Sequence, residues 1–366
     1  MRLALRELRR RPQRFATATI VLTLLVVLLL FLGALLDGLF LGSTGAIRAQ
    51  RASVIVYSAD ANDSLVRSRV DPDVRATVVS VPGVDAVGGL GLALAGATVP
   101  GRTEIANVAV IGYEQPPSGV PAPPPEGEAW ADRRLAASGV EVGATIGVGP
   151  QRVPLRIRGW VDDTNFLLQG ALWVAPATWR EVLASSRPDA RVPDDTFAAL
   201  VVRGEGSPSR LAARIDAATG GATKTLTKDD AVLSLPGTRQ QKSTFNGIIS
   251  VTFVVVALVV ALFFALLTLE RTPIYGVLKA LGGSTRTLFV GLLVQATVVA
   301  VVAFVAGGLV TIGLTAVLPA EIPVQLEPAR AVSTLAGVLI TAVLGGAVSL
   351  RRIARVDPAT AIGTGT

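Results

Sequence analysis

The sequence predicts a membrane protein with four transmembrane α-helices and a large mixed α/β domain inserted between the first and second helices. The 366 residues are 51% hydrophobic and only 17% charged, whereas a soluble globular protein has roughly 25% charged residues. Four apolar runs are long enough to cross a bilayer, which takes about 20 helical residues. A segment of different character, residues 42–246, separates the first run from the second.

The predicted spans are residues 15–36, 248–269, 287–318 and 331–350. The first run follows several arginines, as a signal peptide would. It is longer than the apolar core of about 7–15 residues found in signal peptides, and no small-x-small cleavage site closes it. We therefore interpret it as a retained membrane anchor.

Lysines and arginines flank the spans unevenly and predict the orientation. They gather in residues 1–14, 270–286 and 351–366, whereas residues 42–246 carry 21 basic and 21 acidic residues. All three basic flanks are cytoplasmic only if the chain has an even number of spans and both termini inside. The net charge of +7 therefore indicates contact with anionic membrane lipids and no nucleic-acid partner. The expected location is a bacterial plasma membrane.

Residues 42–246 alternate between short apolar stretches and Gly/Pro turns, which is typical of an extracytoplasmic domain built from strands and helices. Strands are expected within 52–60, 140–163 and 196–206. Asp-Pro and Ser-Pro start signals predict helices within 71–83 and 207–220.

A proline-rich connector, Gln115–Glu128, is predicted to divide this domain into two lobes. Three acidic pairs, at 162–163, 194–195 and 229–230, could bind calcium, but they lack the spaced ligands and glycine of a calcium loop. We interpret them as solvated turns and helix caps and predict no metal site. The chain has no histidine and no cysteine, which excludes zinc sites built from these residues. We predict no catalytic residues.

The polar stretch between the second and third spans predicts a short amphipathic helix. Thr272 can cap it, Pro273 suits its first position, and Gly282 and Gly283 end it. Its apolar face comprises Ile274, Val277, Leu278 and Leu281. Periodicity alone leaves open a simple alternative, an interfacial helix that only turns the chain around.

This stretch, "LERTPIYGVLKALGGSTRTLFVGLLVQ", resembles the signature of FtsX/MacB-type ABC transporter permeases. The start, "ALRELRRRPQRFATATIVL", resembles the cytoplasmic elbow helix of that family, here residues 1–14, and its first span. The end, "SLRRIARVDPATAIG", resembles its basic C-terminus, here the cytoplasmic tail 351–366. The segments "GLFLGSTGAIRAQRASVIVYS" and "VEVGATIGVGPQRVPLRIRGWVDDTNFLLQGALWV" look most like the DevC-like branch.

The resemblance implies that residues 270–286 form a coupling helix that docks into a separate ATPase subunit. No G-x-x-x-x-G-K-[ST] motif occurs in the chain, so ATP and magnesium are expected in that partner and no cofactor on this chain. It also implies a permease homodimer with two ATPases. The coupling residues implied are Arg271, Pro273, Ile274, Tyr275, Val277, Leu278, Lys279, Leu281 and Gly282.

The spans contain almost no ionisable residues, which disfavours a proton relay. Asp37 and Glu270 lie at span ends, and Gln295 is an amide in the third span that can hydrogen-bond between helices. The resemblance therefore implies mechanotransmission, with export or extraction of a lipidic, peptide or hydrophobic substrate. Two alternatives remain: a non-transporting regulator of a cell-wall hydrolase, as in the FtsX branch, and a membrane-anchored receptor without an ATPase. An extracytoplasmic adaptor or hydrolase is a further candidate partner.

Overall fold

The computed structural model describes residues 12–186, 192–270, 285–319 and 322–354. The chain forms two compact units. The globular unit is Leu39–Gln241, and the helical unit combines Met1–Gly38 with Lys242–Thr366.

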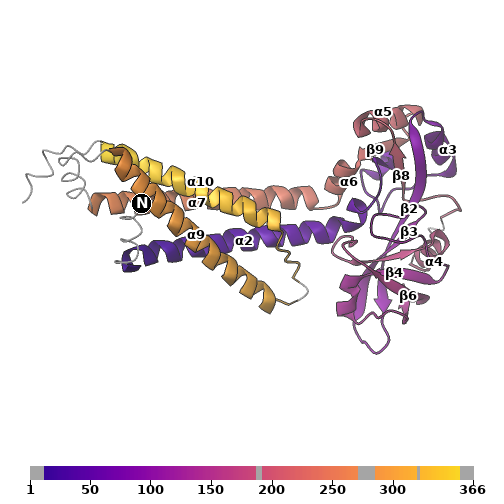
Figure 1. Cartoon of the computed structure of the whole chain (residues 1–366). Helices are drawn as coiled ribbons and strands as arrows, with labels where there is room; N and C mark the ends of the chain where they lie inside the picture. The colour runs from indigo at the N-terminus through magenta and orange to yellow at the C-terminus, as the bar shows by residue number, and fades with distance from the viewer. Residues whose placement is uncertain (1–11, 187–191, 271–284, 320–321, 355–366) are drawn as a thin grey trace, which may run out of the picture. The chain divides into compact units, whose positions relative to one another are not determined.

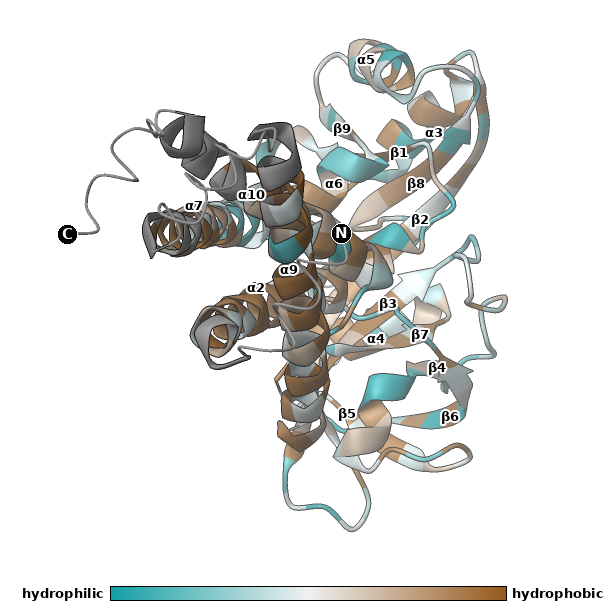
Figure 2. Cartoon of the chain, turned by 60° about the vertical axis from the view of Figure 1, so that its left-hand side comes forward, coloured by the Kyte–Doolittle hydropathy of each residue, from teal (hydrophilic) through white to brown (hydrophobic). Residues whose placement is uncertain are grey.

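Four long helices dominate the chain outside the globular fold: α2 (Pro12–Arg48), α7 (Thr238–Glu270), α9 (Thr285–Val317) and α10 (Pro328–Ala354). Figure 2 shows that hydrophobic residues cover these helices along much of their length, whereas hydrophilic residues are frequent in the globular unit. This distribution is expected of helices that face lipid on the outside.

Three helical stretches in the described part of the chain are long and apolar enough to cross a membrane. They are Ala16–Arg48, Thr238–Phe263 and Leu293–Val317. The fourth predicted span lies on α10, where the apolar stretch among described residues is the shorter Pro328–Leu344. The count of four spans therefore stays a prediction.

α2 and α7 extend beyond their apolar runs. α2 continues to Arg48, past the predicted end of the first span at residue 36, and α7 begins at Thr238, ahead of residue 248. The added turns belong largely to the globular unit, where Ile47 and Thr238 are buried. Tertiary packing thus maintains helical structure where the hydrophobic run has ended.

The globular unit contains one sheet of nine strands. These are β1 (Val54–Ser58), β2 (Val84–Thr98), β3 (Ile105–Tyr113), β4 (Glu128–Asp132), β5 (Thr145–Val148), β6 (Val153–Val161), β7 (Gly170–Val174), β8 (Ala199–Gly204) and β9 (Thr223–Thr227). Their order is β3-β7-β4-β6-β5-β2-β8-β1-β9, and β3 also pairs with β2. That last pairing closes β2, β3, β7, β4, β6 and β5 into a barrel, which removes free strand edges.

The other end of the sheet is an antiparallel layer in the order β2-β8-β1-β9. α3 (Pro72–Ser80) follows β1, and α5 (Pro208–Ala218) follows β8, so the chain order is β1-α3-β2 and then β8-α5-β9. This is a split β-α-β unit of the ferredoxin-like kind. The barrel is inserted between its second and third strands, and the long strand β2 belongs to both lobes (Figure 1).

The strands predicted within 52–60, 140–163 and 196–206 and the two predicted helices are confirmed as β1, β5, β6, β8, α3 and α5. The predicted role of Gln115–Glu128 is wrong. This connector joins β3 to β4, which both belong to the barrel, so it does not separate the lobes. The division lies instead along β2, because this strand pairs with barrel strands at one end and with β8 at the other.

The antiparallel layer has a core on each face. Val54, Val56, Leu200 and Val202 pack against α3 and α5. The alternate residues of the same strands pack with the last turns of α2 and with α6 (Lys228–Ser234). Those contributed by the two helices are Ala46, Ile47, Ala231 and Val232.

The barrel core is covered by α4 (Pro176–Ser186). Trp179 of α4 is fully buried and stacks on Phe197 with ring centroids 6.0 Å apart. A Cβ at Gly112 of β3 would lie 2.6 Å from Trp179, so glycine gives the indole room at this position.

Candidate functional site

The predicted coupling residues lie between α7 and α9, in residues 271–284, outside the described part of the chain. They are Arg271, Pro273, Ile274, Tyr275, Val277, Leu278, Lys279, Leu281 and Gly282. Their coupling role stays a prediction.

The described structure shows how the last turns of α2 are held within the globular unit. A loop between β6 and β7, Asp162–Gln169, lies against the last three turns of α2 and is here called the α2 clamp. Its backbone amides at Leu167 and Leu168 donate to the carbonyls of Ser43 and Gly42, both at 3.0 Å. In the other direction, the amide of Ala46 donates to the carbonyl of Asn165 at 3.0 Å.

A glycine in α2 permits this close approach. A Cβ at Gly45 would lie 2.6 Å from the carbonyl oxygen of Asp163 and 2.9 Å from the amide nitrogen of Asn165. Contacts this short do not occur for real side chains, and the obstructing atoms are backbone. Gly45 therefore allows the helix and the loop to meet through their main chains.

The α2 clamp holds an unfavourable turn. Phe166 and Gln169 exchange backbone hydrogen bonds of 3.0 and 2.9 Å, and the two residues between them, Leu167 and Leu168, have φ of +50° and +66°. Such a turn favours Asn-Gly, and each bulky residue with positive φ costs on the order of 1–3 kcal/mol. The hydrogen bonds to Gly42 and Ser43 offset this cost, so the turn and the helix end stabilise each other.

Side chains complete the attachment. Arg48 donates to Asp163 at 2.7 Å and to the Thr44 hydroxyl at 3.0 Å. The Thr44 hydroxyl in turn donates to the Phe40 carbonyl at 2.6 Å. Ile47 is 1% exposed, and burying such a side chain contributes about 1.5–3 kcal/mol. The end of α2 is thus part of the core of the globular unit.

The globular unit ends in a second attachment that leads into α7. The Thr227 hydroxyl caps α6 by accepting from the Asp230 amide at 3.2 Å. After α6, Leu235 is buried, and its carbonyl accepts from the amide of Thr238, the first residue of α7, at 3.1 Å. Gly237 between them has φ of +79°, a conformation that glycine adopts without strain.

In the helical unit, Asp37 of α2 pairs with Arg330 of α10, which donates through Nε and a terminal nitrogen. The segment before α10 also contacts α2. The backbone amide of Gln325 donates to the Ala34 carbonyl at 2.9 Å, and Gly38 lies against the backbone of Pro323. Gln295, the amide predicted to bond between helices, is buried on α9.

Three members of the acidic pairs have structural roles. Asp162 and Asp163 form ion pairs with Arg133 and Arg48, and Asp230 belongs to the cap of α6. The side-chain hydrogen bond to Asp162 raises the pKa of the exposed Arg133 guanidinium. Among the described residues, no three acidic side chains gather into a group that could hold a metal ion.

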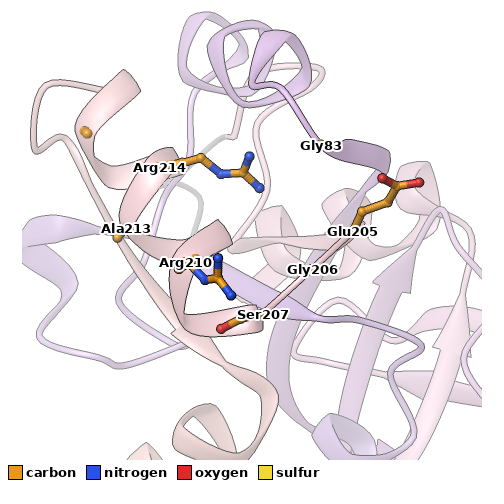
Figure 3. A pocket seen from close by; sticks show the side chains of 8 residues that line it. Gly83, Glu205, Gly206, Ser207, Arg210, Ala213 and Arg214 are labelled. Carbon is orange, nitrogen blue, oxygen red and sulfur yellow. The ribbon is translucent and has the colours of Figure 1, made fainter.

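A groove of about 650 Å³ crosses the surface of the globular unit beside α5 (Figure 3). Arg210 and Arg214 lie along one side, and the carboxylate of Glu205 points away from both guanidinium groups. Its other lining residues are small or glycine. None of the residues that line the groove is buried, so it is an open surface and we assign it no chemistry.

Sequence reasoning did not find the α2 clamp or the Asp37–Arg330 pair. The two leucines give no turn signal, because Leu-Leu is not a turn sequence. Asp37 and Arg330 are visible as charges at span ends, but they lie 293 residues apart and only the fold pairs them. Gly45 is the one available signal, as a glycine inside a helical pattern.

Comparisons with known proteins support the resemblance seen in the coupling segment and at the termini. Residues 246–358 match the family model described as FtsX-like permease C-terminal. An uncharacterised ABC transporter permease of Mycobacterium tuberculosis is 27% identical over 371 residues, covering 98% of each chain. A putative hemin transport system permease protein, HrtB of Staphylococcus epidermidis, is 24% identical over 142 residues, which are 39% of this chain and 41% of that protein.

Among solved structures, the periplasmic region of MacB from Actinobacillus actinomycetemcomitans is 13% identical with a TM-score of 0.35. The match covers 50% of this chain and 92% of that one. The DevC-like branch stays a prediction.

Proposed function

We propose that this chain, an ABC transporter permease of the FtsX-like type, passes movement through the membrane to its globular unit by way of α2. The observation that carries the proposal is the continuity of α2, a single helix of 37 residues whose last turns form part of the globular core. A helix resists compression and bending because each residue is held by hydrogen bonds along the axis. A shift at one end is therefore felt at the other.

The α2 clamp makes the globular end of this helix a fixed attachment. Three backbone hydrogen bonds, the Arg48–Asp163 pair and the buried Ile47 join α2 to the sheet. α7 would act as a second strut, because its first residue follows directly on the buried Leu235. Because α2 and α7 are both fixed in the globular unit, a movement of one helix relative to the other would tilt that unit.

The driving force would come from a separate ABC ATPase that holds ATP and magnesium and docks on residues 270–286. We propose both termini and this loop on the cytoplasmic side, the globular unit on the extracytoplasmic side, and two copies of the chain in the complex. The described spans are apolar, which favours a lipidic, peptide or otherwise hydrophobic substrate over an ion.

The decisive experiment compares Gly45→Val with Gly247→Val. Valine at 45 clashes with the backbone of the α2 clamp, whereas a Cβ at Gly247 of α7 meets nothing within 4 Å. Both variants place a β-branched residue in a helix, so they share the same propensity cost. The permease would be purified with its ABC ATPase in lipid nanodiscs. The natural chain has no cysteine, so the substitution Thr103→Cys introduces a single thiol, to which a spin label is attached.

We expect the distance between labels of two copies to differ between ATP-trapped and ADP-bound complexes for the parent and for Gly247→Val. Gly45→Val should retain ATP hydrolysis and lose this difference, because the helix no longer carries the globular unit with it. A difference that persists in Gly45→Val would overturn transmission through the α2 clamp. Failure of any ATPase to co-purify with the parent would overturn the proposed function as a whole.

A further inference from the structure

The helical unit contains a cavity of about 250 Å³ where α2, α9 and α10 meet. It lies beside residues 30–34 of α2, next to the Asp37–Arg330 pair. Its lining combines apolar residues with two charged ones: Leu30, Ala34, Phe304, Gly308, Thr311, Ile312, Leu326, Glu327, Pro328, Arg330 and Ala331.

The back of the cavity is apolar and closed. Leu30, Ala34 and Thr311 are 5%, 1% and 0% exposed, and the Thr311 hydroxyl donates to the Gly307 carbonyl at 2.8 Å. At the mouth, Ile312 and Leu326 are 58% and 43% exposed. The cavity therefore has an apolar interior that opens to the surroundings of the helices through apolar residues.

The two charged lining residues, Glu327 and Arg330, both lie at the start of α10. The Arg330 stem crosses α2 at Gly33, where the absence of a side chain gives it room, and its guanidinium reaches Asp37 one turn further along. This pair is self-neutralising. Glu327 is exposed and forms no ion pair among the described residues. The N-terminus of α10 carries about half a positive charge, which offsets only part of the Glu327 carboxylate.

We propose that this cavity binds the apolar chain of a cationic amphiphile, with the amine of the ligand beside Glu327. An apolar cavity with a few polar groups at one end is the usual form of a small-molecule site. Its volume is slightly below the roughly 300–1,000 Å³ of sites for drug-sized ligands, so it holds one chain and not a whole two-chain lipid. Binding needs no ATP, so this inference stands apart from the proposed coupling.

Two glycines of α9 provide a matched pair of probes. Gly308 lines the cavity and Gly313 does not. A Cβ added at either glycine meets nothing within 4 Å. Because the chain has no cysteine, Gly308→Cys and Gly313→Cys each introduce a single thiol without a clash. The thiol would be labelled with uncharged N-ethylmaleimide in phosphatidylcholine nanodiscs containing dodecylammonium, dodecyl sulfate or dodecanol at equal mole fraction.

We expect dodecylammonium to slow the labelling of Gly308→Cys about two- to fivefold more than dodecyl sulfate does. This ratio of the two labelling rates is what one partly exposed ion pair between the amine and Glu327 would give. Adding Glu327→Gln should abolish this ratio, and Gly313→Cys should show no protection. Equal protection by all three probes, or protection at Gly313→Cys, would mean ordinary partition into lipid and would overturn the proposal. Stronger protection by dodecyl sulfate would overturn it as well, because Arg330 would then set the preference.

Discussion

The globular and helical units bury different side chains. The largest fully buried side chains of the described residues include Trp173, Trp179, Tyr57, Tyr113 and Phe166, all in the globular unit. The buried core of the helical unit consists of Leu, Val and Ala, and its aromatic side chains, Phe253, Phe263 and Phe304, are only partly buried. Most exposed large hydrophobic side chains lie on α2, α7, α9 and α10.

The difference reflects the two solvents. In water, removing large apolar side chains from the surface drives folding. In lipid, that gain is absent, and helices associate through close contacts at small residues and through interhelical polar pairs. The globular unit therefore needs large buried side chains, whereas the helical unit needs small residues where helices meet. We expect loss of side-chain volume to destabilise the first and gain of side-chain volume to destabilise the second.

The largest effect is expected from removing volume in the globular unit. Trp179→Ala should destabilise it by about 3–5 kcal/mol, because the stack on Phe197 is lost and a cavity remains. Hydrogen exchange of the full chain would measure this for each unit separately. Trp160→Ala, at a half-buried position, is the control and should cost less. Equal losses for both would argue against a core that depends on Trp179.

A smaller effect is expected from adding volume in the helical unit. Gly307→Leu should cost about 1–3 kcal/mol, because a Cβ there lies 2.7 Å from the side chain of Val26. Gly313→Leu on the same helix meets open space and should be close to neutral. Thermal unfolding of the purified chain in one detergent gives the comparison. If the two variants had the same midpoint, close packing of α2 and α9 would not limit stability.

The smallest effect is expected from alkali. Burial, with a further contribution from Asp63, raises the pKa of Tyr57 above its ordinary value near 10. The neutral phenol is favoured when folded, so its contribution is present below pH 10 and is lost as pH rises through the folded pKa. Tyr57→Phe should therefore make the stability of the globular unit less sensitive to pH above 10. At pH 7 the stability should change little, because the Tyr57 hydroxyl has no hydrogen-bond partner to lose.

Tyr113→Phe is the comparison for that experiment, because burial raises the pKa of Tyr113 as well and this variant should also be less sensitive to alkali. Its hydroxyl donates to the Pro121 carbonyl at 2.7 Å, so this variant should lose about 1 kcal/mol at pH 7. Stability against urea at pH 7 would distinguish the two variants, and the change in stability between pH 7 and pH 11 would measure the contribution of each phenol. An unchanged alkaline sensitivity in Tyr57→Phe would show that other groups govern it.

Features encoded locally could be predicted from the sequence. The apolar runs of α2, α7 and α9 and the strands β1, β6 and β8 depend on composition and alternation over a few residues, and they are where the sequence places them. The barrel could not be predicted, because its closure depends on pairings such as β3 with β7 that join distant segments. The proline-rich connector was misread for the same reason, since prolines mark an extended segment but not what lies on either side.

The candidate site divides in the same way. The short helix between the second and third spans was predicted from periodicity and caps, and its coupling role from the family resemblance. Its residues lie outside the described part of the chain. The α2 clamp depends on Leu167 and Leu168 adopting positive φ, which their own preferences oppose. The hydrogen bonds that the amides of these two residues donate to carbonyls of α2 stabilise that conformation, so no local rule could have found it.

The strand order has a consequence for how the protein is made. β1 pairs with two strands, β8 and β9, and both come after residue 198 in the sequence. During synthesis, β1 therefore waits as an unpaired strand, "VIVYS", until the barrel segment and β8 have been made. Unpaired apolar strands recruit other chains. Slow or interrupted synthesis should thus favour aggregation through β1, and a chaperone that covers this strand would act in that interval.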